Sequence, residues 1–240
     1  MEPSQTPKNR IQLIDALRGL CILLVVAYHT GYNLVFFELI PEETLYNPLL
    51  NTLQPLFAGM FILLSGVSAR YARDNRTRGL RVLGCALVVS LATGVFGTPI
   101  TFGILHCLGC CMVIGGEPSA WLDKIPRRLQ PVLFGGLFVL CFMMFPMNDE
   151  AFAGVPYLYM FGLYSPEFKS MDYFPLLPWF FLYPLGAWLG LYIKEGRLPR
   201  WFYDVKVPIL PILGRHTLVI YMLHQPVMYF AVMLLASIIQ

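Results

Sequence analysis

The chain has 240 residues, of which 57% are hydrophobic and 13% are charged. Soluble domains are nearer one quarter charged, so this composition excludes an ordinary soluble domain and indicates a polytopic integral membrane protein. The formal net charge of +3 comes from basic residues in short loops rather than from one patch, which argues against nucleic acid as a partner. No polar stretch is long enough for a separate soluble domain, so residues 1–240 are expected to form a single integral-membrane domain.

Apolar runs of helical length predict an all-α bundle of about seven transmembrane helices. The expected spans are residues 14–37, 50–69, 80–97, 101–116, 129–147, 173–193 and 212–238. Of the 17 Lys and Arg residues, 16, beginning with Lys8 and Arg10, fall on one side of this topology, and only Lys169 falls on the other. The positive-inside rule therefore predicts a cytoplasmic N-terminus and a C-terminus outside.

The first span carries polar side chains along one stripe, namely Asp15, Arg18, His29 and Asn33. A polar stripe in an apolar helix is costly unless it faces protein or water, so this stripe is the leading candidate for the functional face. Asp15 and Arg18 are three residues apart near the cytoplasmic end of the span. They are expected to form a structural ion pair, and the alternative is a role at a cytosolic donor site.

Three of the four histidines, His29, His106 and His224, are expected within the bilayer. The predicted topology puts His29 and His106 at a similar depth in the outer half, and His224 near the middle of the membrane. Each histidine could simply hydrogen-bond a neighbouring helix. The functional alternative is proton transfer, because a neutral imidazole can accept a proton from an acceptor hydroxyl or amine.

Residues 70–81 form an arginine-rich run, RYARDNRTRGLR, which follows the second span. In one interpretation, its arginines do no more than fix topology and contact anionic lipid. Alternatively, some of them bind the phosphates of a cytosolic donor, for which the guanidinium group is well shaped. Just before the run, Ser65-Gly66 could allow a close helix approach. Ser65 has no base beside it in the sequence, so a serine nucleophile is disfavoured.

The segment at 148–172 combines acidic residues with Tyr157, Tyr159 and Tyr164. These tyrosines are best explained as an interfacial belt, and a lid or acceptor-recognition loop is the alternative. The next span contains three prolines, Pro175, Pro178 and Pro184, and is predicted to bend or unwind near the outer surface.

The six cysteines all fall within apolar runs and are expected to be buried hydrophobic residues rather than disulfides. Cys107-Leu-Gly-Cys110 beside His106 has the spacing of half a metal site. The sequence holds no second half, so no metal is expected.

The stretch IDALRG and the Arg18-x10-His29 spacing resemble the first helix of the transmembrane acyltransferase superfamily. The nearest resemblance is to small bacterial proteins with a heparan-α-glucosaminide N-acetyltransferase-like catalytic domain. Further similar stretches are LFAGMFILLSGVSAR (56–70), FGILHCLG (102–109), DYFPLLPW (172–179) and LGRHTLVIYMLHQPV (213–227). The last of these also resembles the closing helix of acyltransferase-3 proteins.

The resemblance implies acyl transfer from cytosolic acetyl-CoA, or another acyl-CoA, to a carbohydrate or other hydroxyl or amine acceptor. It makes His29 the active-site histidine, with Arg18 as its partner and His106 in the same cavity. The full set of expected catalytic residues is His29, His106, Arg18 and Asp15. Donor binding is assigned to Arg70, Arg73, Arg76, Arg78 and Ser65. Substrate binding is assigned to Asn33, His224 and Trp179.

The expected protein is thus an acyl-CoA-dependent acyltransferase of the bacterial inner membrane. Its partners would be acyl-CoA, the lipid bilayer and an acceptor such as a sugar, a glycan or a lipid headgroup. Larger relatives have more spans, so a homo-oligomer is a further expectation. Two alternatives are a proton-coupled transporter that uses the intramembrane histidines, and a non-catalytic membrane protein that retains the fold.

Overall fold

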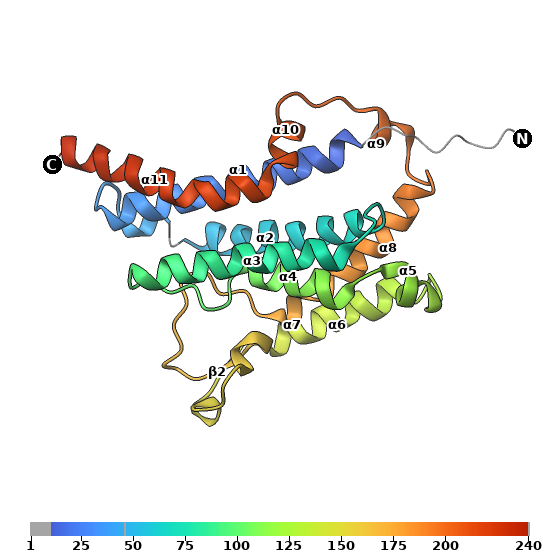
Figure 1. Cartoon of the computed structure of the whole chain (residues 1–240), viewed down its shortest axis with the longest axis horizontal. Coiled ribbons are helices and arrows are strands. Elements are labelled where there is room, and N and C mark those ends of the chain that lie inside the picture. The colour runs from blue at the N-terminus through green and yellow to red at the C-terminus, as the bar shows by residue number, and fades with distance from the viewer. Residues whose placement is uncertain (1–10, 46, 240) are drawn as a thin grey trace, which may run out of the picture. The chain divides into compact units, whose positions relative to one another are not determined.

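A computed structural model describes residues 11–45 and 47–239, so Lys8 and Arg10 lie outside the described residues. The longer helices are α1 (Gln12–Phe36), α2 (Pro48–Ala69), α3 (Asn75–Val95), α4 (Ile104–Gly115), α6 (Gln130–Met144), α8 (Leu182–Lys194) and α11 (Thr217–Ile239) (Figure 1). The short helices are α5 (Pro118–Trp121), α7 (Leu176–Trp179), α9 (Arg200–Asp204) and α10 (Leu210–Arg215). Single 3-10 turns are η1 (Glu42–Thr44), η2 (Leu122–Lys124), η3 (Glu150–Phe152) and η4 (Leu158–Phe161).

The all-α prediction is confirmed, and each predicted span contains an apolar helix. Among the described residues, five helical segments are long and apolar enough to cross a membrane: α1, α2, α3, Leu176–Lys194 and α11. The other two, α4 and α6, are apolar but have only 12 and 15 residues. The count of seven spans and the orientation of the termini therefore stay predictions.

The chain divides into two compact units. The first comprises the residues up to Phe61 together with those from Leu198 onward, and the second comprises Ile62–Arg197.

In the first unit, α1 and α11 run side by side, and α10 packs on the N-terminal half of α1 (Figure 1). Two glycines make the α1–α10 contact close. A Cβ atom on Gly19 would lie 2.1 Å from the Leu210 carbonyl oxygen, and one on Gly214 would lie 1.8 Å from that of Asp15. Only hydrogen fits at these two positions, so the glycines determine where α10 meets α1.

In the second unit, α3 and α4 form an antiparallel hairpin joined by residues 96–103. The end of α2 packs directly on α8. A Cβ atom on Gly66 would lie 2.0 Å from the Tyr183 carbonyl oxygen, and one on Gly186 would lie 2.0 Å from that of Leu63. This contact confirms the close helix approach predicted at Ser65-Gly66.

The proline-rich span is broken, as predicted. Helix α7 ends at Trp179 and α8 begins at Leu182, and within α7 Leu177 has extended dihedral angles (φ −96°, ψ 129°). A residue that precedes proline is disfavoured in the helical region, so Pro178 accounts for the conformation of Leu177.

Residues 145–175 connect α6 to α7 and contain a feature that hydropathy did not predict. Two short strands, β1 (Met147–Asn148) and β2 (Leu163–Tyr164), pair in parallel. The turns η3 and η4 lie between them in the chain, so the segment folds on itself instead of crossing as an open loop.

We expect Gly66→Ala to destabilise the second unit, because the added methyl group meets backbone rather than a flexible side chain. Overpacking of this kind costs about 1–3 kcal/mol. The matched control is Gly84→Ala in α3, where a Cβ atom has nothing within 4 Å. Its helix propensity should improve by up to about 1 kcal/mol. Thermal unfolding in detergent should separate the two variants, and equal melting temperatures would contradict the close contact.

Candidate functional site

The C-terminal half of α1 and the middle of α11 bring four polar side chains together, which we call the histidine cluster: His29, Asn33, His224 and Gln225. The imidazole centroids of His29 and His224 are 5.1 Å apart. The Gln225 Nε2 donates to Asn33 Oδ1 at 3.0 Å. Residues from opposite ends of the sequence thus form one polar group between two apolar helices of the first unit.

The hydrogen bond of His224 determines its tautomer. His224 Nδ1 lies 2.6 Å from the carbonyl oxygen of Tyr221, one turn earlier in α11. A carbonyl oxygen can only accept, so Nδ1 carries the hydrogen and the lone pair of the neutral ring is on Nε2. An imidazole held in this way has the lone pair that a general base needs.

The amide pair of the cluster keeps unused hydrogen-bonding capacity. Asn33 is 2% exposed, and neither its Nδ2 nor the Oε1 of Gln225 has a hydrogen-bond partner among the described residues. A buried amide group without a partner costs about 1–3 kcal/mol. The pair therefore offers one donor and one acceptor to a polar group of a ligand beside the histidines.

Asp15 and Arg18 lie at the other end of α1. Asp15 precedes His29 by about 20 Å along the helix axis. The buried Asp15 carboxylate pairs with Arg215 of α10, with 3.6 Å between Oδ2 and Nε. Arg18, on the same helix, is half-buried and has a polar or electrostatic partner of its own. The ion pair between α1 and α10 adds to the glycine contacts that join these helices.

His106 sits in the second unit, where its ring caps α4. The backbone N–H of Gly103 donates to His106 Nδ1 at 3.2 Å. The lone pair is therefore on Nδ1, and Nε2 carries the hydrogen that reaches Ser90 Oγ at 3.2 Å. The Ser90 hydroxyl in turn donates to the carbonyl of Ile100 at 2.5 Å. Both ring nitrogens of His106 are thus engaged in holding the 96–103 connection against α3 and α4.

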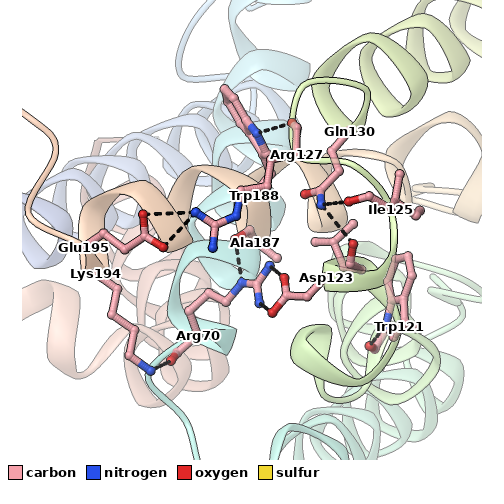
Figure 2. Close-up of polar contacts among 12 residues, drawn as sticks. Arg70, Trp121, Asp123, Ile125, Arg127, Gln130, Ala187, Trp188, Lys194 and Glu195 are labelled. Atoms are coloured by element: carbon pink, nitrogen blue, oxygen red, sulfur yellow. Dashed lines mark hydrogen bonds and ion pairs between the residues drawn. The ribbon is translucent and has the colours of Figure 1, made fainter.

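Among the predicted donor-binding arginines, Arg70 is engaged inside the protein (Figure 2). Its guanidinium group forms two hydrogen bonds to the Asp123 carboxylate, at 2.8 and 3.0 Å, and its Nε donates to the carbonyl of Ala187 at 2.8 Å. Lys194 Nζ donates to the backbone carbonyl of Arg70 at 3.1 Å. Arg70 is 8% exposed, so this side chain joins α2, η2 and α8.

Arg73 and Arg76, in contrast, are exposed, and no ion pair engages them among the described residues. Arg78 is half-buried and donates to Asn75 Oδ1 at 3.3 Å. Asn75 is itself held by Glu117, whose carboxylate accepts from the Asn75 backbone N–H at 2.8 Å. The start of α3 therefore presents cationic side chains from a rigid helix terminus.

The cap of α3 adds order to this basic segment. The Asp74 side chain accepts a hydrogen bond from the Thr77 backbone N–H at 2.9 Å. Hydrogen bonding from Thr77, first from its side chain and then from its backbone N–H, holds the pKa of Asp74 below its ordinary value. Asp74 therefore stays ionised and fixes the start of α3, the helix end that carries the arginines.

The remaining predicted residues have surroundings typical of core residues. Ser65 is buried in α2, next to the Gly66 contact with α8. Trp179 packs against Phe138 and Phe174, with ring centroids 5.9 and 5.5 Å away.

All six cysteines are free. Within residues 11–45 and 47–239, no group of three or more His, Cys, Asp or Glu side chains is placed to hold a metal ion.

The sequence-based reasoning missed three partners of predicted residues. Gln225 is the amide partner of Asn33, and its signal was an amide next to His224 in an otherwise apolar helix. Arg215 and Asp123 are the partners of Asp15 and Arg70. The sequence analysis counts Arg215 only as a loop charge and does not single out Asp123.

These features define an integral membrane helix bundle with an imidazole and amide cluster inside apolar helices and a basic segment at a helix end. The family model described as heparan-alpha-glucosaminide N-acetyltransferase, catalytic, matches residues 10–226. The match covers most of the chain, which therefore belongs to this family of membrane acetyltransferases. Comparisons with curated proteins and with solved structures give no match.

We expect the buried Arg70 pair to matter more for stability than the exposed Arg127–Glu195 pair (Figure 2). Removing one partner of a buried pair lowers the free energy of unfolding by about 3–5 kcal/mol. Because Asp123 is partly exposed, we expect a smaller loss of roughly 2 kcal/mol for Arg70→Met. Arg127→Met should cost below about 1 kcal/mol. Equal losses of melting temperature in detergent would contradict a structural role for Arg70.

Proposed function

We propose that the protein transfers an acetyl or other short acyl group from cytosolic acyl-CoA, with acetyl-CoA as the first candidate, to a hydroxyl or amine acceptor such as a carbohydrate. Membership of the acetyltransferase family supports the type of reaction. The observation that carries the proposal is the histidine cluster, in which two imidazoles lie 5.1 Å apart beside an amide pair with unused hydrogen-bonding atoms.

The histidine cluster has the groups that acyl transfer needs. In direct transfer, His29 removes the proton from the acceptor O–H or N–H, the acceptor atom attacks the thioester carbonyl, and the C–S bond breaks. The CoA thiolate leaves and takes up the proton. Alternatively, the His29 imidazole attacks the thioester carbonyl, the C–S bond breaks and CoA leaves as the thiol with the imidazole proton, and the acyl group then passes from His29 to the acceptor, whose proton returns to the imidazole. His224, with its lone pair on Nε2, supports either route by hydrogen-bonding a proton of the acceptor or of His29.

The amide pair would orient the acceptor. Asn33 Nδ2 can donate to an acceptor oxygen, and Gln225 Oε1 can accept from a hydroxyl or an amine. Because His106 is engaged as a cap of α4 and Trp179 in ring packing, we propose structural roles for both. Asp15 and Arg18 would act at a distance from His29, through the position of α1.

For the donor, we propose that Arg73, Arg76 and Arg78 contact the CoA phosphates. The exposure of Arg73 and Arg76, in contrast to the internal pairing of Arg70, supports this assignment, and the half-buried Arg78 lies beside them at the start of α3. Guanidinium groups on a fixed helix terminus can form paired hydrogen bonds to phosphate oxygens.

The same proposal includes the predicted topology. With the N-terminus in the cytoplasm, the start of α3 faces the compartment that holds acyl-CoA. We propose the bacterial plasma membrane as the location and a homo-oligomer as the working assembly.

The test of the reaction is release of CoA thiol from acetyl-CoA by the purified protein, with a panel of sugars, amino sugars and small amines as acceptors. We expect His29→Ala to lower turnover by about 10²–10⁴-fold, the usual contribution of a general base. His224→Gln should also lower it, because the amide lacks the Nε2 lone pair. The matched control is His216→Gln, which changes an exposed histidine outside the cluster.

Full turnover in the His29→Ala variant would contradict the catalytic assignment. A folded wild-type protein that binds acetyl-CoA but releases no CoA with any acceptor would contradict the transferase proposal. It would favour the transporter or the non-catalytic protein instead.

Acetyl-CoA binding is tested separately by calorimetry on the full chain in detergent. We expect the triple variant Arg73→Gln/Arg76→Gln/Arg78→Gln to lose acetyl-CoA binding. Wild type should lose binding in a similar way at high salt, because salt screens the same charges. The control Lys124→Gln/Arg127→Gln/Arg128→Gln removes the same charge from exposed residues of another connection and should keep binding. Equal weakening in both variants would indicate a general charge effect and contradict a phosphate site at α3.

A further inference from the structure

The segment between α6 and α7 forms an open cavity of about 420 Å³ at its surface. Four aromatic rings line it together with small and aliphatic residues, Ser165 and Glu167; the rings are Phe152, Tyr159, Tyr164 and Phe168. The β1–β2 pairing closes the segment, because Met147 N–H donates to Gly162 O at 2.7 Å and Asp149 N–H to Tyr164 O at 3.1 Å. The cavity is thus formed by a folded element within one unit.

Three of the four lining rings contact one another. Tyr159 and Phe168 stack with centroids 5.0 Å apart, and Tyr164 lies 5.5 Å from Phe168. Tyr173, which does not line the cavity, holds these rings in place, since its ring contacts Tyr164 and Phe168 and its hydroxyl donates to the Tyr159 carbonyl at 2.5 Å. The rings therefore form a fixed aromatic wall rather than a set of mobile side chains.

The charge of the cavity has one sign. Glu167 is the charged residue of the lining, and its exposed carboxylate has no hydrogen bond or ion pair among the described residues. Asp149 and Glu150 add further negative charge on the same segment. Lys169 follows Phe168 but does not line the cavity. Burial raises the pKa of the Tyr159 phenol, so this ring is neutral at physiological pH.

We propose that this cavity binds a small organic cation, of the ammonium class. Aromatic faces attract cations through the ring quadrupole, and aromatic cages with a carboxylate are suited to alkylammonium groups. A neutral sugar fits less well, because its hydroxyls need many hydrogen-bonding groups and the lining has no Asn, Gln, Arg or Asp. A purely apolar ligand would gain nothing from Glu167.

The test compares choline with 3,3-dimethylbutan-1-ol, which has the same shape but a carbon atom in place of the charged nitrogen. Each compound is titrated into the purified full chain in non-ionic detergent, and binding is measured by calorimetry. We expect choline to bind about tenfold or more tightly than the neutral compound, because only the cation interacts with the ring quadrupoles and with Glu167.

Variants separate the two parts of the interaction. Glu167→Gln should weaken choline binding by about five- to tenfold and leave the neutral compound unaffected. Phe152→Leu, which keeps an apolar wall but removes a ring, should also weaken choline selectively. The matched control is Glu150→Gln, which removes the same charge from the segment outside the cavity lining and should change affinity by less than about twofold.

Equal affinity for the two compounds would overturn the proposal and indicate a merely apolar cavity. No binding of choline to a protein with wild-type melting temperature would also overturn it. Equal effects of Glu150→Gln and Glu167→Gln would show a general charge effect instead of a site. This experiment measures binding alone, so its outcome is independent of whether the proposed acyl transfer occurs.

Discussion

Polar side chains in apolar helices must find hydrogen-bond partners within the protein, because lipid cannot supply them. This constraint explains the main contacts of the chain. Asp15 pairs with Arg215 across α1 and α10, and the amide of Asn33 meets that of Gln225 across α1 and α11. Glycines bring the helix backbones close together, as Gly214 does at the backbone carbonyl of Asp15. Polar side chains of the two helices can then reach each other. Packing and polar pairing therefore support one another within the first unit.

The same constraint divides similar residues into structural and functional groups. Arg70 and Arg73 are three residues apart, yet one is enclosed by a carboxylate and a carbonyl and the other is exposed. His106 uses both ring nitrogens in a helix cap, whereas His224 directs one nitrogen to its own helix and keeps a lone pair on the other. A residue whose polar atoms are all engaged by the fold is a poor candidate for chemistry. The members of the histidine cluster are better ones.

Much of the fold could be predicted from local sequence. Apolar runs gave the positions of the helices, the proline-rich stretch gave the break near Leu177, and Ser65-Gly66 gave a close helix contact. The partners of the site residues could not be predicted, because they depend on which helices meet. Arg215, which pairs with Asp15, comes two hundred residues later in the sequence. The pairing of β1 with β2 was missed for a similar reason, since strands of two residues leave no periodic pattern.

The two shorter apolar helices have a consequence for the surrounding lipid. At 12 and 15 residues, α4 and α6 are about 18 and 22 Å long, against a hydrocarbon thickness of about 30 Å. If α4 and α6 cross the membrane as the sequence predicts, the lipid beside them must thin, or the connecting segments must enter the headgroup region deeply. Exposed apolar side chains of α6, such as Val132 and Met143, extend almost to its ends. A bilayer with shorter acyl chains would match this surface at a lower elastic cost, so membrane thickness becomes a variable that could tune the protein's behaviour.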